Sequence, residues 1–411
     1  MIQTGGRIPA AGLFVPADPP PVPPRPIHSM RRCWLQLMVL LAIAGRGTGL
    51  AGPIDLPGLN GDGGEFPLWD HLLTLKAGGG YKNNALLAAF NPQDTPLVTA
   101  GIELFLTRLP ADGHQWTVFF TGDQRRYLDP VQLTSDQPAA TQELLLLSQV
   151  SYKHYGARWV QGLSFTHLHA EQAFDATDLG GQPGMIRASG HAFILTPSLR
   201  YPLPRGFHLQ ADYVLTRQLF QSPVSSYWEF GPRVSAGWQY RTNGSIEVSY
   251  QYTERPFDSR LQTDPLGQSL ADTSLTTFDS RYEVSWKQTW YTPRKFQTIV
   301  RGFRISRFEN GEGFSDYHRL GGSITTQLEC GKWAFRGLAR WSTFDFDLQI
   351  VSVFDPVPRT REETEFEGRI EYRWTPRFRT YAEYLHERQR SNVQADHYHA
   401  NTWQAGVEVD F

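Results

Sequence analysis

Apolar and polar residues alternate one by one over much of the chain from Leu72 onward, and a period of 2 fits this pattern far better than a period of 3.6. The clearest segment places Phe366, Gly368, Ile370, Tyr372 and Trp374 on one face and Glu365, Glu367, Arg369, Glu371 and Arg373 on the other. Similar segments run for about 10 to 16 residues, the length that a tilted strand needs to cross a bilayer. The pattern therefore predicts a series of membrane-spanning β-strands.

Tight turn signals divide the alternating region at intervals of about 38 to 50 residues. They lie at Pro110–Gly113, His154–Gly156, Pro202–Gly206, Arg241–Gly244, Thr292–Arg294, Cys330–Lys332 and Thr375–Arg377. Longer polar connections are expected between them, at Asn83–Thr95, Asp123–Ala140, Phe174–Gly184, Glu254–Ser274, Glu309–Ser315, Asp345–Arg361 and Arg388–His397. Two strands around each turn, with one more at each end, make sixteen.

These elements predict an all-β fold: a transmembrane, antiparallel, up-and-down β-barrel of about 16 strands. Fourteen strands is the alternative, because Phe296–Phe308 alternates poorly around Arg301 and Arg304, where a bulge could disturb the count. Short turns on one side and long loops on the other are typical of the periplasmic and extracellular faces of such a barrel. Both termini are expected on the periplasmic side.

The N-terminal region does not share the alternating pattern. Residues 1–29 form a Pro-rich leader, interpreted as a possible mis-assigned gene start, and residues 30–51 have the basic, apolar and small-residue parts of a secretory signal peptide. A short periplasmic segment, 52–70, and a transmembrane barrel, 71–411, complete the predicted organisation.

Composition agrees with a barrel and argues against other classes. The 411 residues are 40% hydrophobic and 13% aromatic, and the mean hydropathy of -0.40 excludes a polytopic helical membrane protein. Without residues 1–51, which hold five Arg and one Asp, the chain has 34 basic and 40 acidic residues, so the formal charge is -6 and no nucleic-acid partner is expected. Cys330 is then the one cysteine left, which excludes an internal disulfide.

The C-terminus carries the most specific motif, TWQAGVEVDF. Gln404, Gly406, Val409 and Phe411 are placed as polar-x-Gly-x-x-apolar-x-aromatic, which resembles the closing-strand signal of Gram-negative outer-membrane proteins. That resemblance implies recognition by the barrel assembly machinery and by periplasmic chaperones. The GGGYKNNALL segment and the tandem hairpins also resemble the barrel domains of surface lipoprotein assembly modifiers, although the helical repeat domain of those proteins has no counterpart here.

A sixteen-stranded barrel is wide enough to enclose water, so a passive, porin-like channel for small polar solutes is the leading hypothesis. The pore-lining candidates are charged residues on the polar face of the strands: Arg233, Asp279, Arg281, Glu283, Lys287, Arg319, Arg336, Arg340, Glu365, Glu367, Arg369, Glu371 and Arg373. They could select solutes by charge, or they could pair across strands and brace the wall. The alternatives are a component of a surface-protein or lipoprotein export system, and a structural or adhesive barrel with an occluded lumen.

An enzyme is not expected. His167, His169 and Glu171 share one strand face and His397 and His399 another, but Ser164 falls on the opposite face from the first set and no nucleophile-elbow motif occurs. No third metal ligand follows from the spacing, so neither a metal nor a cofactor is expected. Outer-membrane lipid is the expected surrounding, and a homotrimer is a possible assembly.

Overall fold

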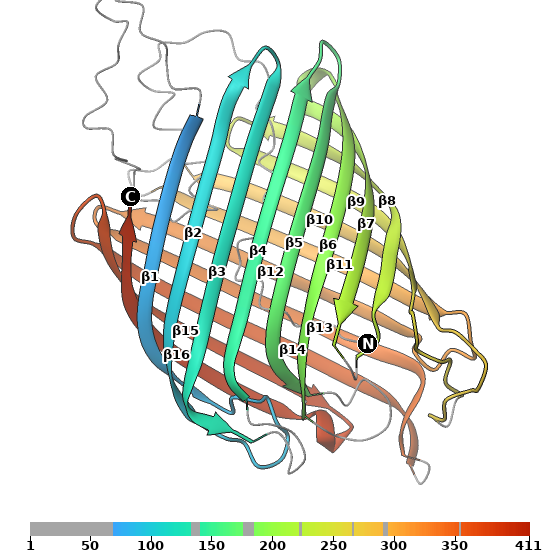
Figure 1. Ribbon diagram of the computed structural model, residues 1–411. Coiled ribbons are helices and arrows are strands. Elements are labelled where there is room, and N and C mark those ends of the chain that lie inside the picture. Colours follow the sequence, from blue (N-terminus) through green and yellow to red (C-terminus); the bar gives the residue numbers. More distant parts are fainter. Residues whose placement is uncertain are drawn as a thin grey trace, which may run out of the picture.

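The computed structural model describes residues 69–132, 140–175, 185–221, 224–264, 267–290, 295–352 and 355–411. Within these residues, sixteen antiparallel strands follow one another and close into a single barrel (Figure 1). The predicted fold class and the count of sixteen are confirmed. The predicted segments 1–29 and 30–51, and all but the last two residues of 52–70, lie outside the described residues.

The strands are long, as crossing a bilayer at a tilt requires. Their bounds are β1 Trp69–Asn83, β2 Thr95–Ala111, β3 His114–Val131, β4 Ala140–Tyr155, β5 Val160–Asp175, β6 Met185–Pro202, β7 Phe207–Phe220, β8 Tyr227–Arg241, β9 Gly244–Pro256, β10 Thr276–Trp290, β11 Phe296–Glu309, β12 Tyr317–Cys330, β13 Trp333–Ser352, β14 Asp355–Arg373, β15 Phe378–Ser391 and β16 Tyr398–Asp410. Two 3-10 turns, η2 Pro204–Gly206 and η3 Gln394–Asp396, lie between strands. No helix among the described residues is long and apolar enough to span a membrane.

The barrel closes where the first strand meets the last. β1 pairs with β16 over ten residue pairs, from Thr74 opposite Asp410 to Asn83 opposite Asn401. In Figure 1 the blue β1 runs beside the red β16, and the C-terminus lies at the same end as the hairpins that join β2 to β3 and β4 to β5. The short turns, the beginning of β1 and the end of β16 therefore lie at the same end of the barrel, which is called here the turn end. The longer connections lie at the opposite end, called the loop end.

The turn ends of the strands agree with the predicted turn signals. Six of the seven signals fall between consecutive strands, and the seventh, 292–294, lies outside the described residues between β10 and β11.

Two predictions of loops at the loop end were wrong. The segment Asp345–Arg361 is largely a long hairpin of β13 and β14 rather than a loop, and β3 continues to Val131 where a loop from Asp123 was expected. The connection from Phe220 to Tyr227 was not predicted.

Strand β11, for which the sequence left a bulge open, is a regular strand. It pairs without register shifts with β10 from Phe296 to Glu309 and with β12 from Phe296 to Arg307. Phe303 and Ile305 pack in the buried cluster of the inner wall, while Val300 and Phe308 are exposed on the outer wall. By this alternation Arg301 faces inward and Arg304 faces outward. The apolar–polar alternation of this segment is weak because one of its two arginines lies on the outward face. The fourteen-strand alternative is thereby excluded.

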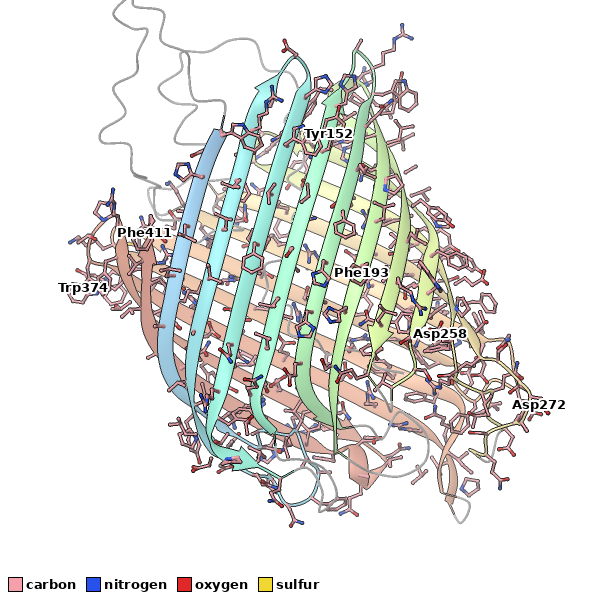
Figure 2. The ribbon with its side chains drawn as sticks, in the orientation of Figure 1. Tyr152, Phe193, Asp258, Asp272, Trp374 and Phe411 are labelled. Carbon is pink, nitrogen blue, oxygen red and sulfur yellow. The ribbon has the colours of Figure 1, made fainter. Side chains whose placement is uncertain are left out.

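The outer wall is apolar between two levels of aromatic side chains. At the turn end, Trp116 packs on Tyr152, Trp159 on Tyr201 and Trp333 on Tyr372, with ring centroids 4.6 to 4.8 Å apart. Toward the loop end, Trp403 packs on Tyr384 at 4.0 Å. Figure 2 shows Tyr152, Trp374 and Phe411 toward the turn end, with Asp258 and Asp272 at the opposite end. Aromatic residues at both edges of an apolar belt are the pattern of a transmembrane barrel.

Candidate functional site: the inner wall of the barrel

All thirteen pore-lining candidates lie on the inward face of their strands, because each alternates with outward residues. On β10, for example, Arg281 and Glu283 flank Tyr282, which is 57% exposed on the outer wall. On β14 the inward Glu365, Glu367, Arg369 and Glu371 alternate with the exposed Phe366 and Ile370. The structure therefore places the candidates on one surface, but it divides them into groups with different surroundings.

The first group consists of ion pairs in which the arginine side chain extends into the barrel. Arg233, Arg281 and Arg340 have side chains 40 to 42% exposed, and they pair with Asp212, Glu283 and Glu365 at 2.7, 2.5 and 3.2 Å. These three carboxylates are less exposed than their partners, at 1, 23 and 27%. The charged surface offered to the interior at these pairs is therefore mainly guanidinium. These three pairs are called the lumen pairs below.

The second group combines arginines with aromatic rings on β11 to β14. Arg319 lies 4.4 Å from the ring centroid of Phe344 and 5.3 Å from that of Phe303, and Arg361 lies 4.5 Å from the same Phe344 ring. Glu363 pairs with both arginines, at 3.2 and 2.6 Å. Cation–π stacking and a shared carboxylate hold these side chains against the wall. Both arginines are therefore braced against the wall, while Glu363 keeps 30% of its side chain exposed.

A neighbouring, largely buried network extends that bracing across four strands. Asp279 of β10 pairs with Arg307 of β11 and lies 3.8 Å from Arg255 of β9, which in turn pairs with Glu229 of β8. Arg307 is 3% exposed and stacks 5.0 Å from the ring centroid of Tyr317. Asp279 is thus part of a structural network, although the sequence alone suggested it for the pore.

The third group surrounds the closing strand and is called here the seam network. Arg369 of β14 contacts Glu371 at 2.7 Å, Glu383 at 3.3 Å and Glu408 at 2.6 Å. Arg379 of β15 also pairs with Glu408, and its second contact is Asp410 at 2.5 Å. Thr74 Oγ1 of β1 donates a 2.7 Å hydrogen bond to Asp410. The network therefore connects β14, β15 and β16 to the first strand across the closure.

The seam network is buried, unlike the lumen pairs. The side chains of Arg369, Glu371, Arg379 and Glu408 are 1 to 9% exposed. Buried charges are stable only when they are paired and hydrogen-bonded, so these residues depend on one another. Two pore-lining candidates, Arg369 and Glu371, therefore have a structural position rather than one that contacts solutes.

The remaining candidates also lie inward. By register, Lys287 lies opposite Ile299, Arg336 opposite both Gln327 and Arg369, Arg373 opposite Arg379 at the turn end, and Glu367 between Leu338 and Leu385.

Other positions on the inner wall are apolar. Leu72, Phe105, Phe119 and Leu147 form a buried apolar cluster over β1 to β4. The inner wall is therefore apolar in part near β1 to β4 and more strongly charged from β8 onward.

The residues of the C-terminal motif have structural surroundings of their own. A Cβ atom at Gly406 would lie 2.4 Å from the Ala77 carbonyl oxygen and 2.8 Å from the Tyr381 ring, and its register partner is Gly78. Only glycine allows this close approach. Gln404 donates a hydrogen bond to Glu383 inside the barrel, and Phe411 is 44% exposed. The motif therefore coincides with the closure, while its recognition by assembly factors stays a prediction.

Sequence reasoning missed Glu408 and Asp410, although a signal for them exists. Both alternate with Val407 and Val409 and so belong to the polar face of the last strand. Their partners, Arg369 and Arg379, lie 39 and 31 positions away in the chain, and no local pattern links them.

The histidines form a cluster that spacing did not indicate. His191 of β6 lies opposite His169 of β5, and its Nδ1 is 3.1 Å from His167 Nε2. The rings of His169 and His191 stack at 4.4 Å. Ser164 faces inward and accepts a hydrogen bond from Gln149, as its predicted position on the other face requires. In the described part of the chain, no group of three histidine, cysteine or acidic residues could hold a metal ion.

Comparisons with known proteins give no relationship at the level of sequence. No family model matches the chain, and no curated protein matches it. Similar solved structures include OmpT, an outer membrane protein of Vibrio cholerae, at 11% identity over 84% of this chain and 97% of that one, with a TM-score of 0.43. An anion-selective porin from Comamonas acidovorans matches at 11% identity over 84% and 100% of the two chains, with a TM-score of 0.41. CdiB from Acinetobacter baumannii matches at 10% identity, over 83% of this chain and 60% of that one, with a TM-score of 0.43.

These likenesses are too distant to assign an activity. The architecture stands on the chain's own geometry: sixteen antiparallel strands, complete closure, aromatic levels at both edges of an apolar outer wall, and a charged inner wall. An apolar outside with a polar inside reverses the arrangement of a water-soluble protein and suits a bilayer. The chain is an outer-membrane-type β-barrel.

Proposed function

We propose that the protein is a passive channel for small polar solutes in the outer membrane, with its turn end and both termini in the periplasm. The observation that carries the proposal is the closed sixteen-stranded barrel with lumen pairs on its inner wall. Barrels of this strand number leave an aqueous channel, because side chains alone do not fill them. Assembly through the barrel assembly machinery and chaperones, and trimerisation, remain part of this proposal.

The lumen pairs support a weak preference for anions. Arg233, Arg281 and Arg340 are each about two-fifths exposed, and their carboxylate partners are less so. Glu247, at 49% exposed, opposes this trend near His208. The field inside a water-filled barrel depends on the charges nearest the permeating ion, so exposed guanidinium groups favour anions.

The described part of the β9–β10 connection lies along the rim. Asp258 binds Arg217 of β7, Gln262 donates a hydrogen bond to the Asn310 carbonyl oxygen, and the Phe257 amide binds the Leu275 carbonyl oxygen. Those contacts fasten this loop to its neighbours at the edge of the wall. They leave the ion pairs deeper in the barrel to set selectivity.

The test is the conductance of the refolded full chain in planar bilayers, with the reversal potential measured across a salt gradient. Stepwise conductance and a reversal potential on the anion side support the proposal. A folded barrel that inserts without conducting would overturn it and favour an export component or an adhesive barrel with an occluded lumen. A heat-denatured sample at the same detergent concentration is the control for leakage.

A further inference from the structure

Arg304 is a cation on the apolar outer wall. Its cross-strand neighbours are Tyr282 of β10 and Leu320 of β12, which are 57% and 54% exposed. Arg304 is itself exposed, and within the described residues it takes part in no hydrogen bond, ion pair or ring contact. A charged side chain on the lipid-facing side of a barrel destabilises it increasingly with depth, so an anion is needed to compensate.

The chain supplies such an anion to a similar arginine elsewhere. Arg217 of β7 also lies outward between two exposed apolar neighbours, Phe193 and Trp228. The loop residue Asp258 binds it with two contacts, at 2.8 and 2.5 Å. No carboxylate in the described part of the chain binds Arg304, although its cross-strand neighbours are as apolar as those of Arg217.

Arg304 lies inside the apolar belt, at a depth from which its side chain can reach the headgroup region of one leaflet. Along β11 it lies eight residues from Phe296 at the turn end and four from the exposed Phe308 toward the loop end. At about 3.3 Å per residue and a tilt of about 40°, it lies roughly 10 Å below Phe308. An arginine side chain spans much of that distance when it extends toward the polar surface.

Polar groups continue from Arg304 toward the loop end. Ser306 follows on the same face, and its Oγ lies 3.0 Å from His318 Nδ1. The nearest outward carboxylates by register are Asp345, opposite His318, and Glu254, opposite Phe278, and neither forms an ion pair with Arg304. On the turn-end side, a Cβ atom at Gly302 would meet no atom within 4 Å, which leaves space for a hydrocarbon chain beside Val300.

We infer that Arg304, with Ser306 and His318, binds the phosphate of a lipid headgroup on the outer wall of the barrel. The guanidinium fork matches phosphate oxygens in geometry and charge, and an anionic headgroup would place its acyl chains over the apolar wall below. The phosphate could belong to a phosphorylated glycolipid or to an anionic phospholipid. The inference rests on the proposed membrane location but not on an open pore.

The test is native mass spectrometry of the full chain in detergent, which counts bound lipids. The probes are bisphosphorylated lipid A, its dephosphorylated form and phosphatidylglycerol. Arg304→Gln should lower the fraction bound to a phosphorylated probe about fivefold or more, and Arg304→Lys should lower it less. The matched control is Arg217→Gln on β7, an outward arginine between Phe193 and Trp228. Its guanidinium is already bound by Asp258, so this variant should bind lipid as the parent chain does.

Each outcome decides the inference. Loss with lipid A alone assigns a glycolipid, and loss with both phosphorylated probes assigns any anionic lipid; both support the site. Equal binding by the parent and Arg304→Gln chains, or equal binding of phosphorylated and dephosphorylated lipid A by the parent chain, overturns it. Loss of an oligomer mass in place of a lipid mass also overturns it, because Arg304 would then contact a second copy. Conductance of the same samples tests the pore separately.

Discussion

The lumen pairs and the seam network use the same residue types on the same face of neighbouring strands, yet they differ in surroundings. Arg340 on β13 has one carboxylate partner, Glu365, and a side chain 41% exposed. Arg369 on β14 has three carboxylate partners and a side chain 9% exposed. Exposed pairs in a high dielectric contribute little stability, whereas removing one member of a buried network leaves an uncompensated charge. An inward charge on a barrel wall can therefore serve either permeation or closure, and burial decides which.

The largest effect is expected from removing the central carboxylate of the seam network. Glu408→Ala leaves Arg369 and Arg379 buried with fewer partners and should lower the free energy of unfolding by about 3 to 5 kcal/mol. Urea unfolding in lipid vesicles, followed by tryptophan fluorescence, measures this change. The matched control is Glu365→Ala in a lumen pair, for which a loss of about 0 to 1 kcal/mol is expected. Equal losses in the two variants would remove the distinction between the groups.

The next effect concerns selectivity rather than stability. Arg340→Glu should move the reversal potential toward cations, changing the permeability ratio by at least about twofold, because it reverses an exposed charge beside the solute path. Arg340→Gln should fall between that variant and the parent chain. Both are measured in planar bilayers across a salt gradient. An unchanged reversal potential in Arg340→Glu would mean that the lumen pairs do not face the permeating ions.

A smaller effect follows from salt. Raising the ionic strength from about 0.1 to 1 M shortens the Debye length from about 10 to 3 Å, which should reduce the anion preference of the parent channel. The stability lost in Glu408→Ala should change much less over the same range, because buried pairs are screened weakly. Reversal potentials and unfolding curves in the same two buffers give both quantities. A seam defect that salt abolishes would show that solvent reaches the network.

The smallest effect is expected at the rim. The Arg217 hydrogen bonds hold the pKa of the Asp258 carboxyl below its ordinary value. Because the folded pKa lies below the unfolded one, the pair stabilises the loop at neutral pH, and this contribution is lost as the pH falls through the acidic range below about 4. Hydrogen exchange of the loop at pH 7 and at acidic pH should show loosening in the parent chain. Asp258→Asn should be loosened already at pH 7 and show less change.

The fold could be predicted because its main signals are local. Alternation assigned the face of each strand, and turn signals such as Arg241–Gly244 and Thr375–Arg377 fixed where strands end. The loop end was predicted less well, because Asp345–Arg361 is polar whether it forms a loop or a hairpin that extends beyond the apolar belt. A polar segment indicates contact with water, which a loop and an extended hairpin have equally.

The division of the inner wall could not be predicted from the sequence. Alternation identifies Arg369 and Arg340 as inward residues, but their burial depends on side chains from other strands, such as Glu408, 39 positions from Arg369. Cross-strand neighbours are set by register, and register between distant strands is not written in any short segment. For the same reason, the sequence did not predict that His191 lies beside His167 and His169.

The closure of β1 on β16 also has a consequence for how the barrel forms. The hydrogen bond from Thr74 to Asp410 joins residues 336 positions apart, whereas the other strand pairs join consecutive strands. Contacts of such high order form late, so the other fifteen pairings can exist as a curved open sheet before the ends meet. That sheet presents two unpaired edges, which are templates for aggregation until they join. Gly78 and Gly406 allow the close approach of the two edges in the final closing step. The yield of folded protein therefore depends on how well the two edges are protected before that step.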